Sequence, residues 1–297
     1  MKKFLFFLFK VFLLVFVFLI IFGNFQNYVF RNGSYNKVQW INSKENNSYE
    51  VVFIGNSRSA LFGLNDNSID YINLADDGSG LKTTYLQLYL FFKNNNKTKQ
   101  VLWDVDVYSL NNRFSDNKRS PRWLPFFNDS IIYSTLKNDH SAFKFYRILP
   151  ALSYSAFKFD WNQAALMNNL FDLKESNFGN YGFNNSCESF EHRSDVVKGI
   201  SNYDSLQPKW VWVDKIHNLC KENNSTLKLF TSPYHTMLDS ASSNVIFNSE
   251  LNKRKLRLVD HSRIYLNIDE YFADYRHLNC NGVKNYVELL KKDVIFN

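Results

Sequence analysis

The sequence predicts an α/β domain built on a parallel sheet and preceded by one membrane-spanning helix. Two observations support this fold class. An apolar run occupies positions 4–22, and short β-branched or aromatic segments alternate with helical segments along the rest of the chain. Because parallel neighbouring strands need crossover connections, this alternation predicts a three-layer α/β/α arrangement with helices on both faces of the sheet.

The apolar run from Phe4 to Phe22 has nineteen residues and one charge, Lys10. As an α-helix it would be about 28 Å long, which is enough to cross a bilayer. A cleaved signal peptide is the alternative, but it needs a shorter apolar region followed by small residues, and the residues after Phe22 do not provide them. We therefore expect an uncleaved signal anchor at residues 1–23. Lys2 and Lys3 predict a cytoplasmic N-terminus and an extracytoplasmic working part.

Composition excludes several classes of protein. The chain has 45% hydrophobic and 21% charged residues, with ten Gly and five Pro, which excludes disordered, collagen-like and repeat architectures. The formal net charge of +7 includes three lysines in or beside the apolar run, so the remainder of the chain carries +4. No zinc-finger, helix-turn-helix or RNA-binding signature accompanies this small excess, and we expect no nucleic-acid partner.

Regular secondary structure is expected from residue 49 onward, after a polar stalk at residues 24–48. The expected strands are 49–55, 70–75, 100–108, 226–232 and 263–268. The expected helices cover about 81–92, 208–221, 243–257 and 283–292. These elements predict one domain over residues 49–297. An aromatic-rich insertion at about 111–204 interrupts it, and we expect this insertion to lie over one end of the sheet.

Ligands in parallel α/β folds bind at the carboxyl ends of the strands, so the loops there are the candidate sites. The first such loop places Ser57 in a sharp turn that suits a nucleophile, although an ordinary helix cap explains the same residues. The second offers the N–H of Gly78 to a developing oxyanion, and a tight turn is the alternative. Near the end of the chain, Asp274 and His277 have the spacing of a carboxylate that orients a general base, or belong to a solvated loop.

Other strand ends carry further candidates. His235 follows an expected strand and either binds substrate or is a loop histidine without that role. Asp104 and Asp106 would lie on the same face of the strand expected at 100–108. Because no further ligands accompany them, we interpret these carboxylates as acceptors for loop amides rather than as a metal site.

The three cysteines match neither a zinc-binding spacing nor an even disulfide framework. They are Cys187, Cys220 and Cys280. One disulfide pair formed outside the cytoplasm and three small buried thiols both remain open. The sequence therefore predicts no metal site, and we expect no cofactor.

Taken together, the loops resemble those of the SGNH (GDSL-type) hydrolases and acyltransferases. The resemblance rests on Gly55-Asn56-Ser57, on NLADDG at 73–78 and on DYRHLNCNG at 274–282. It covers about residues 50–108 and 206–292. The segments VVFIGNSRSALFGL and FTSPYH, with the N-terminal anchor, look like the membrane-anchored members found with cell-surface polysaccharide and teichoic-acid acylation systems. The family has a flavodoxin-like parallel sheet, which the resemblance therefore implies for this chain.

The resemblance implies Ser57 as nucleophile, His277 as general base and Asp274 as the carboxylate that orients this base. It implies the N–H groups of Ser57 and Gly78 as oxyanion donors; the family's G-x-N-D block has no match here, and Asn111 is the candidate for its Asn. The implied activity is an extracytoplasmic serine esterase or O-acyltransferase acting on an acyl ester, expected to be acetyl, of a cell-surface glycan. A membrane-bound acyltransferase is a further expected partner. The alternative is a non-catalytic accessory protein of a polysaccharide acylation or export system.

Overall fold

The structure is a computed structural model that describes residues 1–32, 36–63, 69–110, 120–146, 207–236 and 241–295. The chain forms two compact units. The first contains residues 1–43 and 117–176, and the second contains residues 44–116 and 177–297. Most of the insertion expected at 111–204 lies outside the described residues. Its expected place over one end of the sheet stays a prediction.

A parallel sheet of five strands forms the centre of the second unit, in the order β2-β1-β3-β4-β5. Its strands are β1 (Ser48–Ile54), β2 (Tyr71–Asn73), β3 (Lys97–Asp104), β4 (Thr226–Thr231) and β5 (Leu258–Asp260). All four strand pairs are parallel. The four residues at the end of β1 are almost completely buried, as expected for a central strand that is covered on both faces. The predicted α/β class with a parallel sheet is confirmed.

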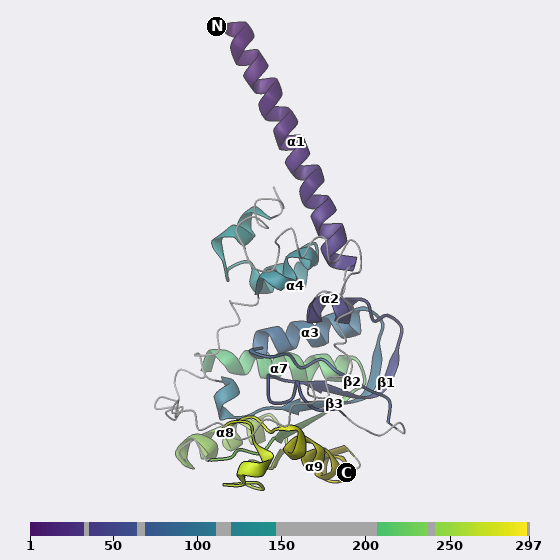
Figure 1. The fold of residues 1–297 in the computed structure, drawn as a ribbon, viewed down its shortest axis with the longest axis vertical. Helices are drawn as coiled ribbons and strands as arrows, with labels where there is room; N and C mark the ends of the chain where they lie inside the picture. The colour runs from purple at the N-terminus through teal and green to yellow at the C-terminus, as the bar shows by residue number, and fades with distance from the viewer. Residues whose placement is uncertain (33–35, 64–68, 111–119, 147–206, 237–240, 296–297) are drawn as a thin grey trace. The chain divides into compact units, whose positions relative to one another are not determined.

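The described part of this unit contains four α-helices. They are α3 (Leu81–Lys93), α7 (Gln207–Glu222), α8 (Ala241–Lys253) and α9 (Cys280–Leu290), the last followed by a π-helical turn, η7 (Lys291–Ile295). In Figure 1, α3 and α7 lie together on one side of the strands and α9 lies on the other side. Tyr286 and Leu290 of α9 join Phe53, Leu102 and Phe230 of the sheet in one buried cluster. The four helices expected from the sequence are therefore present, with ends that differ by a few residues.

The strand expected at 100–108 begins and ends earlier. It is β3, and it ends at Asp104 because the next residues form a short 3-10 helix, η1 (Val107–Leu110). Asp106 holds this turn, since its Oδ1 atom accepts the N–H of Ser109 at 2.6 Å. An Asp side chain that bonds nearby backbone N–H groups ends a strand in favour of a turn.

The prediction of a strand at 263–268 is wrong. The edge strand of the sheet is β5, a few residues earlier, and the chain after it turns repeatedly. Asp260 Oδ1 accepts the N–H of Ser262 at 2.9 Å, which ends β5 in an Asx turn. Asn267 has a φ angle of +61°, which no strand residue adopts. Ile264 is exposed, so the alternating pattern of this segment does not reflect a buried face.

The first unit begins with α1 (Lys2–Asn32), a helix long and apolar enough to cross a membrane. The segment expected to be a stalk is partly helical, because α1 continues to Asn32 and α2 (Lys37–Asn42) follows. A capping box starts α2: Asn36 Oδ1 accepts the N–H of Gln39, and Gln39 Oε1 accepts the N–H of Asn36. The other described elements of this unit are η3 (Ser120–Phe126), α4 (Ser130–Leu136) and η4 (Ser141–Phe145).

Candidate active site

Ser57 lies in the turn that follows β1, at the carboxyl edge of the sheet. The turn needs Gly55, whose φ is +144° and where an added Cβ atom would lie 2.3 Å from Ser59 Oγ. Asn56 stabilises the next turn, because its Oδ1 accepts the N–H of Arg58 at 3.0 Å and its carbonyl oxygen accepts the N–H of Ala60 at 3.0 Å. The side chain of Ser57 is consequently left partly exposed in front of the sheet.

Ser57, His277 and Asp274 form one chain of hydrogen bonds. Ser57 Oγ lies 2.9 Å from His277 Nε2, although the two residues are 220 positions apart in the sequence. His277 Nδ1 lies 2.9 Å from Asp274 Oδ2 and 3.0 Å from Oδ1. Asp274 Oδ1 also accepts the backbone N–H groups of Arg276 and His277, at 2.8 and 2.9 Å. The structure thus brings the three predicted triad residues together in the order nucleophile, base and carboxylate.

The charge of Asp274 determines how the imidazole is protonated. Burial raises the pKa of this carboxyl, but hydrogen bonds and the charge of His277, together with two backbone N–H groups, lower it to about 2. At neutral pH the carboxylate is therefore ionised and acts only as an acceptor. A neutral His277 then carries its proton on Nδ1, which leaves the lone pair of Nε2 directed at the Ser57 hydroxyl.

The loop after β2 lies beside the Ser57 turn, because β2 is the neighbour of β1 in the sheet. The N–H of Asp76 donates to the carbonyl oxygen of Gly55 at 3.5 Å, which joins the two loops. Gly78 occupies the left-handed region at a φ of +63°. Neither the N–H of Ser57 nor that of Gly78 donates a hydrogen bond to another residue in the described part of the chain. Asn111, the third expected oxyanion donor, lies outside the described residues.

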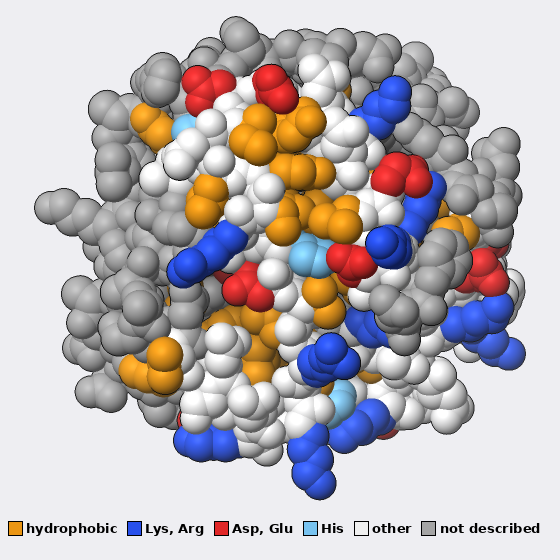
Figure 2. Space-filling view, turned by 90° about the horizontal axis from the view of Figure 1, so that it is seen from below, with side chains coloured by type: hydrophobic (Ala, Val, Ile, Leu, Met, Phe, Trp, Pro, Cys, Tyr) orange, Lys and Arg blue, Asp and Glu red, His pale blue; other side chains and the backbone are white. Residues whose placement is uncertain are grey.

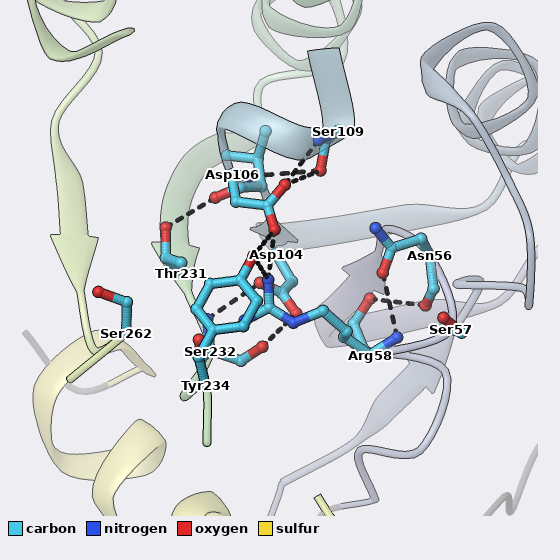
Figure 3. A network of polar contacts seen from close by, with 12 residues as sticks. Asn56, Ser57, Arg58, Asp104, Asp106, Ser109, Thr231, Ser232, Tyr234 and Ser262 are labelled. Carbon is cyan, nitrogen blue, oxygen red and sulfur yellow. Dashed lines mark hydrogen bonds and ion pairs between the residues drawn. The ribbon is translucent and has the colours of Figure 1, made fainter. Parts of the chain in front are cut away.

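Arg58, the residue after Ser57, points into the protein and was not predicted from the sequence. Only 5% of it is exposed. Its Nη1 atom lies 2.5 Å from Asp106 Oδ2 and donates to the Tyr234 hydroxyl at 2.6 Å, and its Nη2 atom donates to the carbonyl oxygen of Ser232. Figure 3 shows the guanidinium between Asp106 and Tyr234, with Ser57 on the other side of the turn. This network joins the ends of β1, β3 and β4.

The two aspartates at the end of β3 belong to the same network. Asp104 accepts the N–H of Ser232 at 3.0 Å and its hydroxyl at 2.7 Å. Since Asp106 accepts the N–H of Ser109, both carboxylates accept backbone amides, as predicted. Burial raises the pKa of Asp104 more than Arg58 and Ser232 lower it. At Asp106 burial also raises the pKa, but the charges of Arg58 and Arg276 and the hydrogen bonds from Tyr234 and Ser109 together outweigh it, and the pKa is lowered. The D-x-D spacing together with an Arg after the serine was the available sequence signal for this ion pair.

His235 is placed behind the loop that carries the triad carboxylate. It is 6% exposed, with Nε2 2.7 Å from Asp269 Oδ1 and Nδ1 2.8 Å from Thr236 Oγ1. Its backbone N–H donates to the carbonyl oxygen of Tyr275, between Asp274 and His277. Because both ring nitrogens contact the chain itself, this geometry favours a role in holding the loop. A direct contact of His235 with substrate stays a prediction.

The cysteines have different states. Cys280, three residues after His277, is disulfide-bonded, whereas Cys220 is free and buried. Cys187 lies outside the described residues. The alternative of three buried thiols is therefore wrong. Burial raises the pKa of the Cys220 thiol to about 12, which makes this thiol unreactive. Within the described ranges, no group of three or more His, Cys, Asp or Glu side chains is arranged to hold a metal ion.

No protein-family model and no curated protein matches this chain. The class of the site therefore depends on its geometry. Ser-His-carboxylate chains recur on unrelated folds and are recognised by their hydrogen bonds rather than by sequence position. Ser57, His277 and Asp274 meet that geometric description at the carboxyl edge of a parallel sheet.

Proposed function

We propose that this chain is a membrane-anchored, SGNH-type serine esterase or O-acyltransferase that acts on an acyl ester, expected to be acetyl, of an extracytoplasmic glycan. One observation carries the proposal: Ser57 Oγ, His277 and Asp274 are joined by hydrogen bonds of 2.9 Å between each neighbouring pair. A serine hydroxyl is a weak nucleophile by itself, and a neutral imidazole held by an ionised carboxylate is the arrangement that activates it.

In the proposed reaction, Ser57 Oγ attacks the acyl carbonyl carbon while His277 Nε2 accepts the hydroxyl proton. The carbonyl oxygen becomes an oxyanion, and the unpaired N–H groups of Ser57 and Gly78 are the donors available to it. The bond to the sugar oxygen then breaks, and His277 returns its proton to that oxygen. Water or a second sugar hydroxyl attacks the acyl-serine in the same way, which releases the acyl group as an acid or as a new ester.

Three features support the type and location that we propose. A parallel sheet with helices on both of its sides is compatible with the three-layer, flavodoxin-like SGNH architecture. The apolar α1 supports a single-pass anchor, with Lys2 and Lys3 favouring a cytoplasmic start. The disulfide at Cys280 supports an oxidising compartment, because disulfides persist mainly outside the cytoplasm.

The proposal is tested by covalent labelling of the full chain in detergent micelles. A fluorophosphonate probe reacts with activated serines, and the intact mass then reports how many probes are attached. We expect one probe per chain in the parent and none in Ser57→Ala or His277→Ala. Ser134→Ala is the matched control, since Ser134 is an exposed serine that lies in α4, outside the triad, and it should label like the parent.

The two outcomes lead to different classes of protein. Labelling that depends on Ser57 justifies incubation with an acetylated glycan, in which free acetate identifies an esterase and a newly acetylated acceptor identifies a transferase. Absence of labelling in protein that unfolds cooperatively would overturn the proposal. It would favour the non-catalytic accessory protein instead. The lack of a match to the family's G-x-N-D block in this sequence supports the same alternative.

A further inference from the structure

A cavity of about 660 Å³ lies at the opposite edge of the sheet from the triad. It is lined by the residues that begin β4 and by those that precede β5, so it is at the amino ends of these strands. The cavity exists because β5 is short: it pairs only with Leu229–Thr231, which leaves the first half of β4 without a neighbour on that side. This volume is within the usual range for sites that bind small molecules.

The charged side chains around this cavity are mostly basic. Lys221, Lys255 and Arg257 line it, and none of the three forms an ion pair with a carboxylate in the described part of the chain. The acidic residue in the lining is Asp293, whose Oδ2 lies 3.4 Å from His261 Nε2. Several cations thus face one hollow without equivalent negative charge, a combination that attracts anions.

Lys228 contributes a further cation from β4. Its Nζ donates to the backbone carbonyl oxygen of Val294 at 2.8 Å, so the ammonium is positioned by a neutral group and its charge is not cancelled. Burial lowers the pKa of this lysine, because a charge removed from water costs free energy unless an opposite charge approaches. A bound anion would supply that charge.

The backbone at Lys255 is also unusual. This residue follows α8 in the left-handed conformation, at a φ of +57°, a place where glycine or asparagine is normally found. Its N–H donates to the carbonyl oxygen of Asn252 at 2.9 Å, which closes the turn. The turn therefore fixes a lysine side chain beside the cavity at some cost in backbone energy. Figure 2 shows that basic side chains also outnumber acidic ones over the lower half of the face drawn there.

We propose that this cavity binds a phosphate-bearing anion. Arginine matches two phosphate oxygens at once, and lysines bind phosphate as point charges, so Arg257 with Lys221 and Lys255 forms a suitable set. The lining also includes apolar residues such as Leu227 and Val259, which could contact an organic group attached to the phosphate. This site does not involve the triad, and it stands whether or not Ser57 is a nucleophile.

Calorimetric titration of the full chain in detergent micelles with inorganic pyrophosphate, at constant ionic strength, tests the proposal. We expect saturable binding of one pyrophosphate per chain. The triple variant Lys221→Gln, Lys255→Gln and Arg257→Gln should bind at least about tenfold more weakly, because it loses three charge-assisted contacts. Ser57→Ala should bind like the parent.

The matched control removes the same number of charges from exposed lysines elsewhere, as Lys137→Gln, Lys144→Gln and Lys284→Gln. It should retain the affinity of the parent. An equal loss in this control would show that net charge alone attracts pyrophosphate, and absence of saturable binding to the parent would show that the cavity is not a phosphate site. Either result overturns the proposal. Thermal unfolding of each variant shows that the protein compared is folded.

Discussion

Ser57 and Arg58 are consecutive residues on one turn, but their side chains enter opposite environments. Ser57 is partly exposed and meets His277 at the carboxyl edge of the sheet. Arg58 is buried and meets Asp106 and Tyr234 beneath that edge. The same turn thus serves two purposes: one side chain is presented to the imidazole of His277, where we propose catalysis, and the next one joins the ends of three strands. The difference teaches that the position of a reactive group can depend on a neighbour that never approaches the substrate.

The largest expected effect is on the rate of hydrolysis in Ser57→Ala, with little change in the stability of the protein. Ser57→Ala should lower the rate of hydrolysis of p-nitrophenyl acetate by at least about 10³-fold, since the proposed nucleophile is lost. Its free energy of unfolding in urea should remain within about 0.5 kcal/mol of the parent, because the side chain is partly exposed and makes one hydrogen bond to another side chain. A variant that keeps its activity would remove the catalytic half of the comparison.

The opposite pattern is expected at Arg58. Arg58→Met leaves Asp106 buried without its cation, which should lower the free energy of unfolding by about 3–5 kcal/mol. Lys99→Met is the matched control, because Lys99 pairs with Glu50 at 2.6 Å but the two side chains are 72% and 42% exposed. This control should cost less than about 1 kcal/mol. If urea unfolding gave equal losses for the two variants, the buried network would not be the structural element that we describe.

Gly55 sharpens the comparison, since it determines the turn that carries both side chains. Gly55→Ala places a methyl group 2.3 Å from Ser59 Oγ in a backbone region that other residues avoid. We expect a loss of about 1–3 kcal/mol in unfolding free energy, and a lower rate of fluorophosphonate labelling because Ser57 moves relative to His277. Unchanged labelling in a destabilised variant would contradict the second part.

The smallest expected effect depends on pH and concerns Asp274. Its pKa in the folded protein, about 2, is below the ordinary value of 3.8, so the ionised carboxylate stabilises the fold above about pH 4. This contribution disappears as the pH falls from about 4 to about 2. Because the side chain is partly exposed, we expect about 1–2 kcal/mol rather than the full value of the shift.

Urea unfolding of the parent and of Asp274→Asn, at a series of pH values, checks this expectation. The parent should be the more stable protein at pH 6, and the difference should shrink towards zero near pH 2. A difference that did not change with pH would show that Asp274 is not held as an ionised acceptor. The titration of other carboxyl groups affects both proteins and so cancels in the difference.

The sequence predicted the parallel sheet and the candidate residues of the site from local patterns, whereas the roles of these residues as a triad were implied by the family resemblance. Short apolar runs identified β1 and β4, and strand-end loops identified Ser57 and Asp274 with His277. The Arg58 network was missed because the D-x-D spacing and the Arg after the serine do not by themselves indicate that the cation is buried against partners 48 and 176 positions away. The strand wrongly predicted at 263–268 has a different cause. The local residue pattern of this segment is typical of a strand, but the edge strand β5 already ends at Asp260 in an Asx turn.

The length of α1 has a consequence for making this protein without its membrane segment. The helix is continuous from Lys2 to Asn32, and its last third has buried residues, among them Gln26, Val29 and Phe30. A soluble version that begins at Asn24 would cut this helix and leave a nine-residue remnant. Helices shorter than about 12–15 residues are marginal in water by themselves. Such a truncation would remove the apolar first part of α1, of which the remnant is the continuation. Loss of solubility after the deletion would therefore indicate a broken helix rather than a requirement for lipid.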